Sequence, residues 1–200
     1  MIIVTTMAQH VDDDKKYDER EKQYMYTMAR IFSYKFPVYC VISETHDNPE
    51  FKPKQFFPFT KLLEIESLDK NMTKSQKEFN SIKLLLSDVN LDNNSWVIKV
   101  SGRYMIYDDM FIDSVKEQPE SIKAVIRTCD SDTQMYTFLF ALRFRYFKDF
   151  FVNNNLPDSI NLERIMLLYI ENVLHHDEIK YVNDLGIFCN IADCNVYTYF

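Results

Sequence analysis

Short β-branched segments alternate with longer helix-compatible segments along most of this chain. Residues 1–7 and 38–42 are predicted as strands, and the charged stretch 15–34 between them is predicted as a helix that ends before Pro37. A strand, a helix and a second strand in this order form a βαβ unit. Continued alternation is typical of an α/β sandwich with a largely parallel sheet. We therefore expect that fold class.

The same patterns predict the remaining elements. Thr73 is a suitable N-cap for a helix over 73–86, and the strand 96–100 follows it directly. After a Pro- and Phe-rich loop at 48–59 and the elements just named, we expect a helix near 108–117, strands at 124–127 and 135–142, an amphipathic helix over 162–174, and a late strand at 187–191. We find no internal repeat or dividing linker, so residues 1–200 are expected to form a single domain.

Composition and charge exclude several classes of protein. The chain has 200 residues, is 46% hydrophobic and carries a net charge of -7. Disorder is excluded, and the acidic balance argues against a nucleic-acid binder. The apolar runs are shorter than the about 18 residues of a membrane helix, and Asp12–Asp14 comes too early for a signal peptide. Four cysteines without a C-x-x-C pair indicate free thiols and a cytoplasmic location.

One of only two glycines, Gly102, lies just past the strand 96–100, in the run Ser101-Gly102-Arg103-Tyr104. A glycine at a strand end allows close approach of the backbone to a ligand, or it forms a tight turn or bulge. Both explanations stay open at this point.

Lys74, Lys77, Lys99 and Arg103 are the candidate cations for an anionic ligand. In open α/β sheets, ligands lie beyond the carboxyl ends of the strands, and a helix N-terminus nearby favours an anion. These cations lie at the start of the helix 73–86 or at the end of the strand 96–100. They suit a diphosphate, although a solvated helix start and an ordinary strand-edge charge explain them as well.

A longer pattern resembles a known group of proteins. Lys74-x-x-x-Glu78-x-x-Ser81-Ile82, a helix, and a strand that ends Ile-Lys-Val-Ser-Gly-Arg-Tyr resemble small glycosyltransferase-like proteins found in bacterial polysaccharide loci and large DNA viruses. Weaker similarity continues in 136–151, 160–163 and 185–187, and so covers most of the chain. Ser75 stands where the group usually has Gly.

The resemblance implies a GT-A-like, Rossmann-related three-layer sandwich that binds a nucleotide diphosphate sugar. It also implies a set of donor-binding residues, which are Thr5, Thr6, Lys74, Lys77, Glu78, Lys99, Ser101, Gly102, Arg103 and Tyr104.

In that fold, the strand corresponding to 96–100 normally ends in Asp-x-Asp, which binds a divalent cation. Lys99 and Arg103 stand at this place and can neutralise a diphosphate directly. We therefore expect no required cofactor, or only weak assistance by Mn²⁺ or Mg²⁺. Asp130 and Asp132 form a literal Asp-x-Asp in a later loop and are the alternative metal ligands.

Sugar transfer also needs a group that takes the proton of the acceptor hydroxyl. Glu163 resembles the carboxylate that many GT-A proteins present at the start of a helix, and it is the expected base, with Arg103 as its catalytic partner on the donor side. A first-turn Glu favoured by the helix dipole is the alternative explanation. Asp108, Asp109 and Tyr136 are the expected acceptor contacts.

The sequence therefore predicts a glycosyltransferase of the cytoplasm, or of the host cytoplasm if the chain is viral. Its expected partners are a nucleotide diphosphate sugar and a glycan or other hydroxyl acceptor, without nucleic acid. A catalytically degenerate glycan- or nucleotide-sugar-binding module is the alternative. A plain nucleotide-binding protein is less well supported, since two glycines cannot form a Gly-rich phosphate loop. The donor, the acceptor, the stereochemistry and the oligomeric state are left open.

Overall fold

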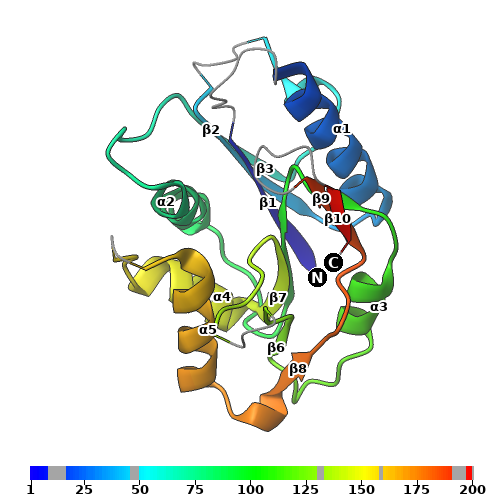
Figure 1. Cartoon of the computed structure of the whole chain (residues 1–200), viewed down its shortest axis with the longest axis vertical. Coiled ribbons are helices and arrows are strands. Elements are labelled where there is room, and N and C mark those ends of the chain that lie inside the picture. Colours follow the sequence, from blue (N-terminus) through cyan, green and yellow to red (C-terminus); the bar gives the residue numbers. More distant parts are fainter. Residues whose placement is uncertain (9–16, 46–49, 130–132, 158–159, 191–196, 200) are drawn as a thin grey trace.

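A seven-stranded sheet with helices on both faces forms the body of the molecule (Figure 1). The computed structural model describes residues 1–8, 17–45, 50–129, 133–157, 160–190 and 197–199. Its elements are β1 (Ile2–Ala8), α1 (Tyr17–Ser33), β2 (Val38–Ser43), the 3-10 helix η2 (Pro53–Gln55), β3 (Lys61–Ile65), α2 (Lys74–Leu86), β4 (Trp96–Ser101), β5 (Met105–Ile106), α3 (Met110–Lys116), β6 (Ala124–Ile126), β7 (Leu139–Arg143), α4 (Phe144–Asn153), α5 (Leu162–Val173), the 3-10 helix η3 (His176–Glu178), β8 (Ile179–Tyr181), β9 (Ile187–Asn190) and β10 (Tyr197–Tyr199).

The strand order of the sheet is β3-β2-β1-β4-β7-β6-β8. β1 pairs in parallel with β2 and β4, and only β7 runs antiparallel to its neighbours β4 and β6. The mainly parallel sheet expected from the sequence is therefore confirmed. The chain adds β2 and β3 on one side of β1 and then crosses to place β4 on the other side. This reversal makes the carboxyl ends of β1 and β4 a topological switch point, where ligands of open α/β sheets bind.

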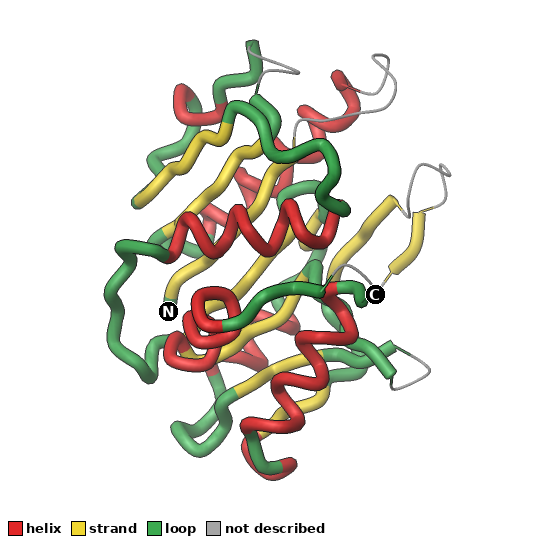
Figure 2. The backbone as a smooth tube through the Cα atoms, turned by 90° about the vertical axis from the view of Figure 1, so that its left-hand side faces the viewer, coloured by secondary structure: helices red, strands yellow, loops and turns green. Residues whose placement is uncertain are grey.

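Two hydrophobic cores lie on opposite faces of the sheet. Along β1, Ile2 and Val4 face the core formed with α2, α4 and α5, whereas Ile3 and Met7 face the core formed with α1 and α3. This alternation follows from the two-residue period of a strand. Figure 2 views the molecule from the side of α2, α4 and α5 and shows these helices in front of the strands. The molecule is thus a three-layer sandwich.

A small antiparallel sheet, in the order β10-β9-β5, lies on the same side of the main sheet as α1 and α3. Its residues Ile106 and Ile187 are buried in the same core as α1 and α3. None of the helices in the described ranges is long and apolar enough to cross a bilayer.

Local sequence signals account for the best predicted elements. Thr73 caps α2 as expected: its hydroxyl accepts from the backbone of Gln76, and the Gln76 side chain accepts from the backbone of Thr73. The strand expected at 135–142 begins only at Leu139. Met135 makes an isolated bridge to Thr128. Residues 136–138, which lie between Met135 and β7, make single backbone hydrogen bonds to Arg127 and Ser101 rather than a regular ladder.

Gly102 is required by a close approach within the protein. Its backbone N–H donates to the carbonyl of Thr6, at 2.9 Å. A Cβ atom at this position would lie 2.8 Å from Cγ of Met7 and 2.9 Å from that carbonyl oxygen. The turn after β4 therefore packs directly against the end of β1, which agrees with the structural explanation of this glycine.

We expect Gly102→Ala to lower the free energy of unfolding by about 1–3 kcal/mol, because the added methyl group overpacks the contact between β1 and β4. Urea denaturation of both proteins measures the difference. The control Ser121→Ala lies on an exposed loop and should change the free energy by about 0.5 kcal/mol or less. Equal stability of Gly102→Ala and the wild type would contradict the proposed contact.

Candidate functional site

Side chains from four elements meet in one hydrogen-bonded network at the switch point. Thr6 comes from β1, Glu78 from α2, Lys99 from β4 and Glu163 from the first turn of α5. All of them were predicted as site residues, and the structure brings them to the same edge of the sheet.

Lys99 is the centre of this network. Its side chain is 1% exposed, and its Nζ lies 2.5 Å from Oε1 of Glu78. The same Nζ donates to Oγ of Ser101, at 2.6 Å, and to the carbonyl oxygen of Thr137, at 2.7 Å. The three N–H groups of an ammonium are thereby matched by three acceptors. Lys99 therefore holds β4 to α2 and to the segment before β7, whereas the sequence predicted it at a diphosphate.

Glu78 supplies the negative charge that a buried ammonium requires. Burial raises the pKa of Glu78, but the Lys99 ammonium, the hydrogen bonds from Lys99 and Thr6 and the charge of Arg103 outweigh burial and lower the pKa below its usual value. The Thr6 hydroxyl donates to Oε1 of Glu78, at 3.0 Å. The carboxylate is therefore ionised at neutral pH and connects β1 to Lys99.

Thr137 links Lys99 to Glu163. Its carbonyl oxygen accepts from Lys99, and its hydroxyl donates to Oε1 of Glu163, at 3.0 Å. Asn161, two residues before Glu163, caps α5 by accepting from the backbone N–H of Arg164. Sequence reasoning missed Thr137, although a polar residue inside the apolar run 136–142 was an available signal.

Most of the expected diphosphate cations have contacts within the protein. Lys77 Nζ lies 2.7 Å from Oε1 of Glu44, a buried carboxylate at the end of β2. Arg103 donates to the Tyr104 hydroxyl, at 3.0 Å, and its guanidinium lies over the Tyr104 ring. Lys74 is exposed in the first turn of α2. A guanidinium has five N–H donors, of which this hydrogen bond uses one, so Arg103 together with the exposed Lys74 is better placed than Lys77 or Lys99 to meet an anion at this edge.

Aromatic side chains lie on the opposite face of the segment that carries Thr137, toward α1 and α3. The Tyr104 and Phe138 rings lie 4.8 Å apart, and the Phe138 and Tyr136 rings lie 5.0 Å apart. The Arg127 guanidinium lies over the Tyr136 ring. All three rings are only partly buried and pack against the core of α1 and α3. Flat apolar faces of this kind can stack on a nucleotide base or a sugar ring.

Other predicted residues do not join the network. Asp109 Oδ1 accepts from Arg30, at 2.9 Å, and from the Tyr34 hydroxyl, at 2.6 Å. α1 ends close to the start of β2, so this cluster lies at the amino edge of the sheet. The expected acceptor contact of Asp109 is therefore not supported, because its carboxylate tethers α1.

Asp108 and Thr5, two further predicted site residues, also lie outside the network. Asp108 Oδ1 accepts from the backbone N–H of Met110, at 3.0 Å, and the Asp108 carboxylate lies against Gly186. Thr5 is fully buried in β1, so its side chain is not open to solvent at the candidate site.

The end of β4 does not fit a divalent cation. Lys99 and Arg103 bring positive charge to this place, and the Glu78 carboxylate is already neutralised by Lys99. Across the described ranges, no group of three or more His, Cys, Asp or Glu residues is arranged to hold a metal ion. Asp130 and Asp132, the alternative ligands, lie outside the described residues.

No protein-family model matches this sequence, and no curated protein matches it as a relative. Solved structures do resemble it. The inositol-1-phosphate CTP transferase from T. maritima aligns with a TM-score of 0.58 and 11% identity, over 90% of this chain and 84% of that one. A protein described as a candidate nucleotide-diphospho-sugar transferase from Desulfovibrio desulfuricans G20 aligns with a TM-score of 0.54 and 10% identity, over 90% and 78%. The fold is that of nucleotidyltransferases and GT-A-like proteins.

The glycosyltransferase GlyE of Streptococcus pneumoniae TIGR4 also shares this fold, with a TM-score of 0.51 and 8% identity. The alignment covers 92% of this chain and 45% of GlyE. The GT-A-like fold expected from the sequence is therefore confirmed, and identities this low extend the likeness to the fold alone.

We expect Lys99→Met to lower the free energy of unfolding by about 3–5 kcal/mol, because it leaves the Glu78 carboxylate without its counter-ion. The double variant Lys99→Met/Glu78→Met should recover about 1 kcal/mol or more of this loss, since no uncompensated charge remains. Urea denaturation of the wild type, the single variant and the double variant measures these differences in the free energy of unfolding.

The control is Lys116→Met, which breaks the exposed pair between Lys116 and Asp113 and should cost about 1 kcal/mol or less. If Lys99→Met lowers the free energy of unfolding no more than Lys116→Met does, the buried network does not depend on the ion pair between Lys99 and Glu78.

Proposed function

We propose that this protein transfers a sugar from a nucleotide diphosphate sugar to a hydroxyl group of a glycan or similar acceptor in the cytoplasm. The observation that carries the proposal is the position of Glu163, held by Thr137 at the switch point and connected through Thr137 to Lys99. The fold supports it, because proteins named for CTP transfer and for glycosyl transfer share this architecture.

Glu163 is the proposed base. The hydrogen bond from Thr137 orients its carboxylate, which has about four lone-pair positions and therefore further capacity to accept. The acceptor hydroxyl gives its proton to this carboxylate while its oxygen forms a bond to the anomeric carbon of the sugar. The bond from that carbon to the diphosphate oxygen breaks, and the nucleoside diphosphate leaves.

Arg103 and Lys74 are the proposed contacts of the leaving diphosphate. Arg103 is partly buried beside the network, where a fixed guanidinium stabilises phosphate charge well. Lys74 adds an exposed positive charge in the first turn of α2, where the partial positive charge of the helix N-terminus also favours an anion. Because cations occupy the end of β4, we propose that the reaction does not require a divalent metal. In this proposal Lys99 holds Glu78 and the Thr137 carbonyl in place and does not touch the donor.

Nucleotidyl transfer from a nucleoside triphosphate is less well supported. Backbone cradles for a triphosphate are typically rich in glycine, and residues 9–16, which follow β1, contain none.

A binding module without catalysis is the second candidate. One observation favours it: Lys77, Lys99 and Arg103 all make contacts within the protein, which leaves fewer cations for a leaving group.

We expect Glu163→Gln to lower the rate of sugar transfer by about 10²–10⁴-fold and to leave the affinity for the nucleotide sugar unchanged, because only the proton acceptor is lost. Release of nucleoside diphosphate in the presence of acceptor glycans measures the rate, and isothermal titration calorimetry measures the affinity. Glu171→Gln makes the same substitution in the exposed last turn of α5 and should change neither quantity.

A fully active Glu163→Gln protein would show that Glu163 is not the base. Tight donor binding by the wild type without turnover on any acceptor would favour the binding module instead.

A further inference from the structure

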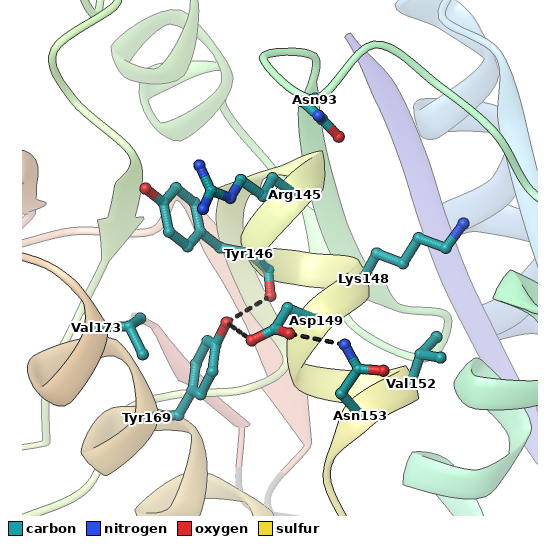
Figure 3. Close-up of a pocket in the computed structure, with 9 residues that line it drawn as sticks. All are labelled: Asn93, Arg145, Tyr146, Lys148, Asp149, Val152, Asn153, Tyr169 and Val173. Atoms are coloured by element: carbon teal, nitrogen blue, oxygen red, sulfur yellow. Dashed lines mark hydrogen bonds between the residues drawn. The ribbon is translucent and has the colours of Figure 1, made fainter.

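A cavity of about 490 Å³ opens on the outer surface of α4 and α5, next to the loop before β4 (Figure 3). Its lining contains none of the residues of the Lys99 network. Asn93, on its rim, precedes β4, and its carbonyl oxygen accepts from the backbone N–H of Arg145 at the start of α4. The cavity therefore lies toward the amino edge of the sheet. Its volume is in the range of small-molecule sites, about 300–1,000 Å³.

A fixed carboxylate lies in the wall of this cavity. Asp149 accepts from the Tyr169 hydroxyl, at 2.7 Å, and from the Asn153 amide, at 2.8 Å (Figure 3). The hydrogen bond from Tyr169, followed by that from Asn153, lowers the pKa of Asp149. Two of its about four lone-pair positions are used in this way. An ionised, oriented carboxylate therefore retains capacity to accept hydrogen bonds from a ligand.

Two cations, Arg145 and Lys148, also line the cavity. The Arg145 guanidinium lies over the Tyr146 ring, 5.6 Å from its centroid, and Lys148 Nζ donates to the carbonyl oxygen of Val89, at 3.0 Å. An anionic ligand in this cavity would meet the charge of Asp149, and a cationic ligand would meet Arg145 and Lys148. A neutral ligand with many hydroxyl groups avoids both repulsions because it carries no net charge. Its hydroxyl groups can donate to the Asp149 carboxylate and accept from the Arg145 guanidinium.

The remaining surface suits the carbon skeleton of such a ligand. Tyr146 and Tyr169 contribute aromatic rings, and Val152 and Val173 contribute aliphatic side chains. Small-molecule sites combine apolar walls of this kind with a few oriented polar groups. The C–H faces of a sugar ring match the walls, and its hydroxyl groups match Asp149 and Arg145.

We propose that this cavity is a second carbohydrate site, which binds a neutral saccharide through Asp149 and Arg145. The site is separate from the carboxyl edge of the sheet, so it does not depend on the proposed transfer reaction. It allows the protein to bind a glycan at a second point, away from the Lys99 network.

Saturation-transfer NMR and calorimetry on the full chain test the proposal, with glucose, galactose, mannose, N-acetylglucosamine, maltose and lactose as neutral probes. Glucuronate, glucosamine and inorganic phosphate are the charged probes. At least one neutral sugar should bind at millimolar concentration. Its dissociation constant should rise about tenfold or more in Arg145→Gln and in Asp149→Asn, since each loses a hydrogen bond to a charged group.

Lys180→Gln is the matched control for Arg145→Gln, because Lys180 is an exposed cation on β8 outside the cavity. It should leave sugar binding unchanged. Arg145 is exposed, so Arg145→Gln should fold even if Asp149→Asn does not. Three results would overturn the proposal: no neutral probe binds, binding is equal in Arg145→Gln and wild type, or a charged probe binds more tightly than every neutral sugar.

Discussion

The buried ammonium of Lys99 is the constraint on which the rest of the candidate site depends. A charge at 1% exposure is stable only when its hydrogen bonds and its counter-ion are supplied by the protein. Glu78, Ser101 and the carbonyl of Thr137 supply them, and each belongs to a different part of the fold. Satisfying one side chain therefore fixes the start of α2, the end of β4 and the segment before β7 relative to one another. Glu163 follows, because the same Thr137 holds its carboxylate.

This arrangement gives the switch point a charge that the resemblance noted in the sequence does not imply. The resemblance noted in the sequence implies a pair of carboxylates and a divalent cation at the end of the strand that corresponds to β4. An ammonium is built into that place instead, and its charge is balanced internally by Glu78. In our proposal, Lys99 thus acts on the site by holding its neighbours in place rather than by contact with a ligand. Any diphosphate bound here must be neutralised by groups around the network, and Arg103 is the nearest fixed cation in our proposal.

The sequence predicted the parts of the fold with strong periodicity, including β1, β2, α2, β4 and α5. It missed β3 and β8, short edge strands in which exposed and partly buried residues blur the alternation. Glu78, Lys99 and Glu163 were found as site candidates from their motifs, but their contacts were not, because the partners are 72, 38 and 26 residues apart along the chain. Asp109 lies close in sequence to Tyr104. Its carboxylate instead meets Arg30 and Tyr34 of a distant segment.

The most direct test of a nucleotide-sugar site organised without a metal is the melting temperature of the protein with uridine, cytidine, guanosine and thymidine diphosphate sugars, each in EDTA and in Mn²⁺. A ligand that binds only the folded state raises this temperature by mass action. We predict that at least one nucleotide sugar raises the melting temperature in EDTA, and that Arg103→Ala reduces the increase. An increase seen only with Mn²⁺ would contradict the metal-free site and direct attention to Asp130 and Asp132. No increase with any donor would contradict the proposed nucleotide-sugar site itself.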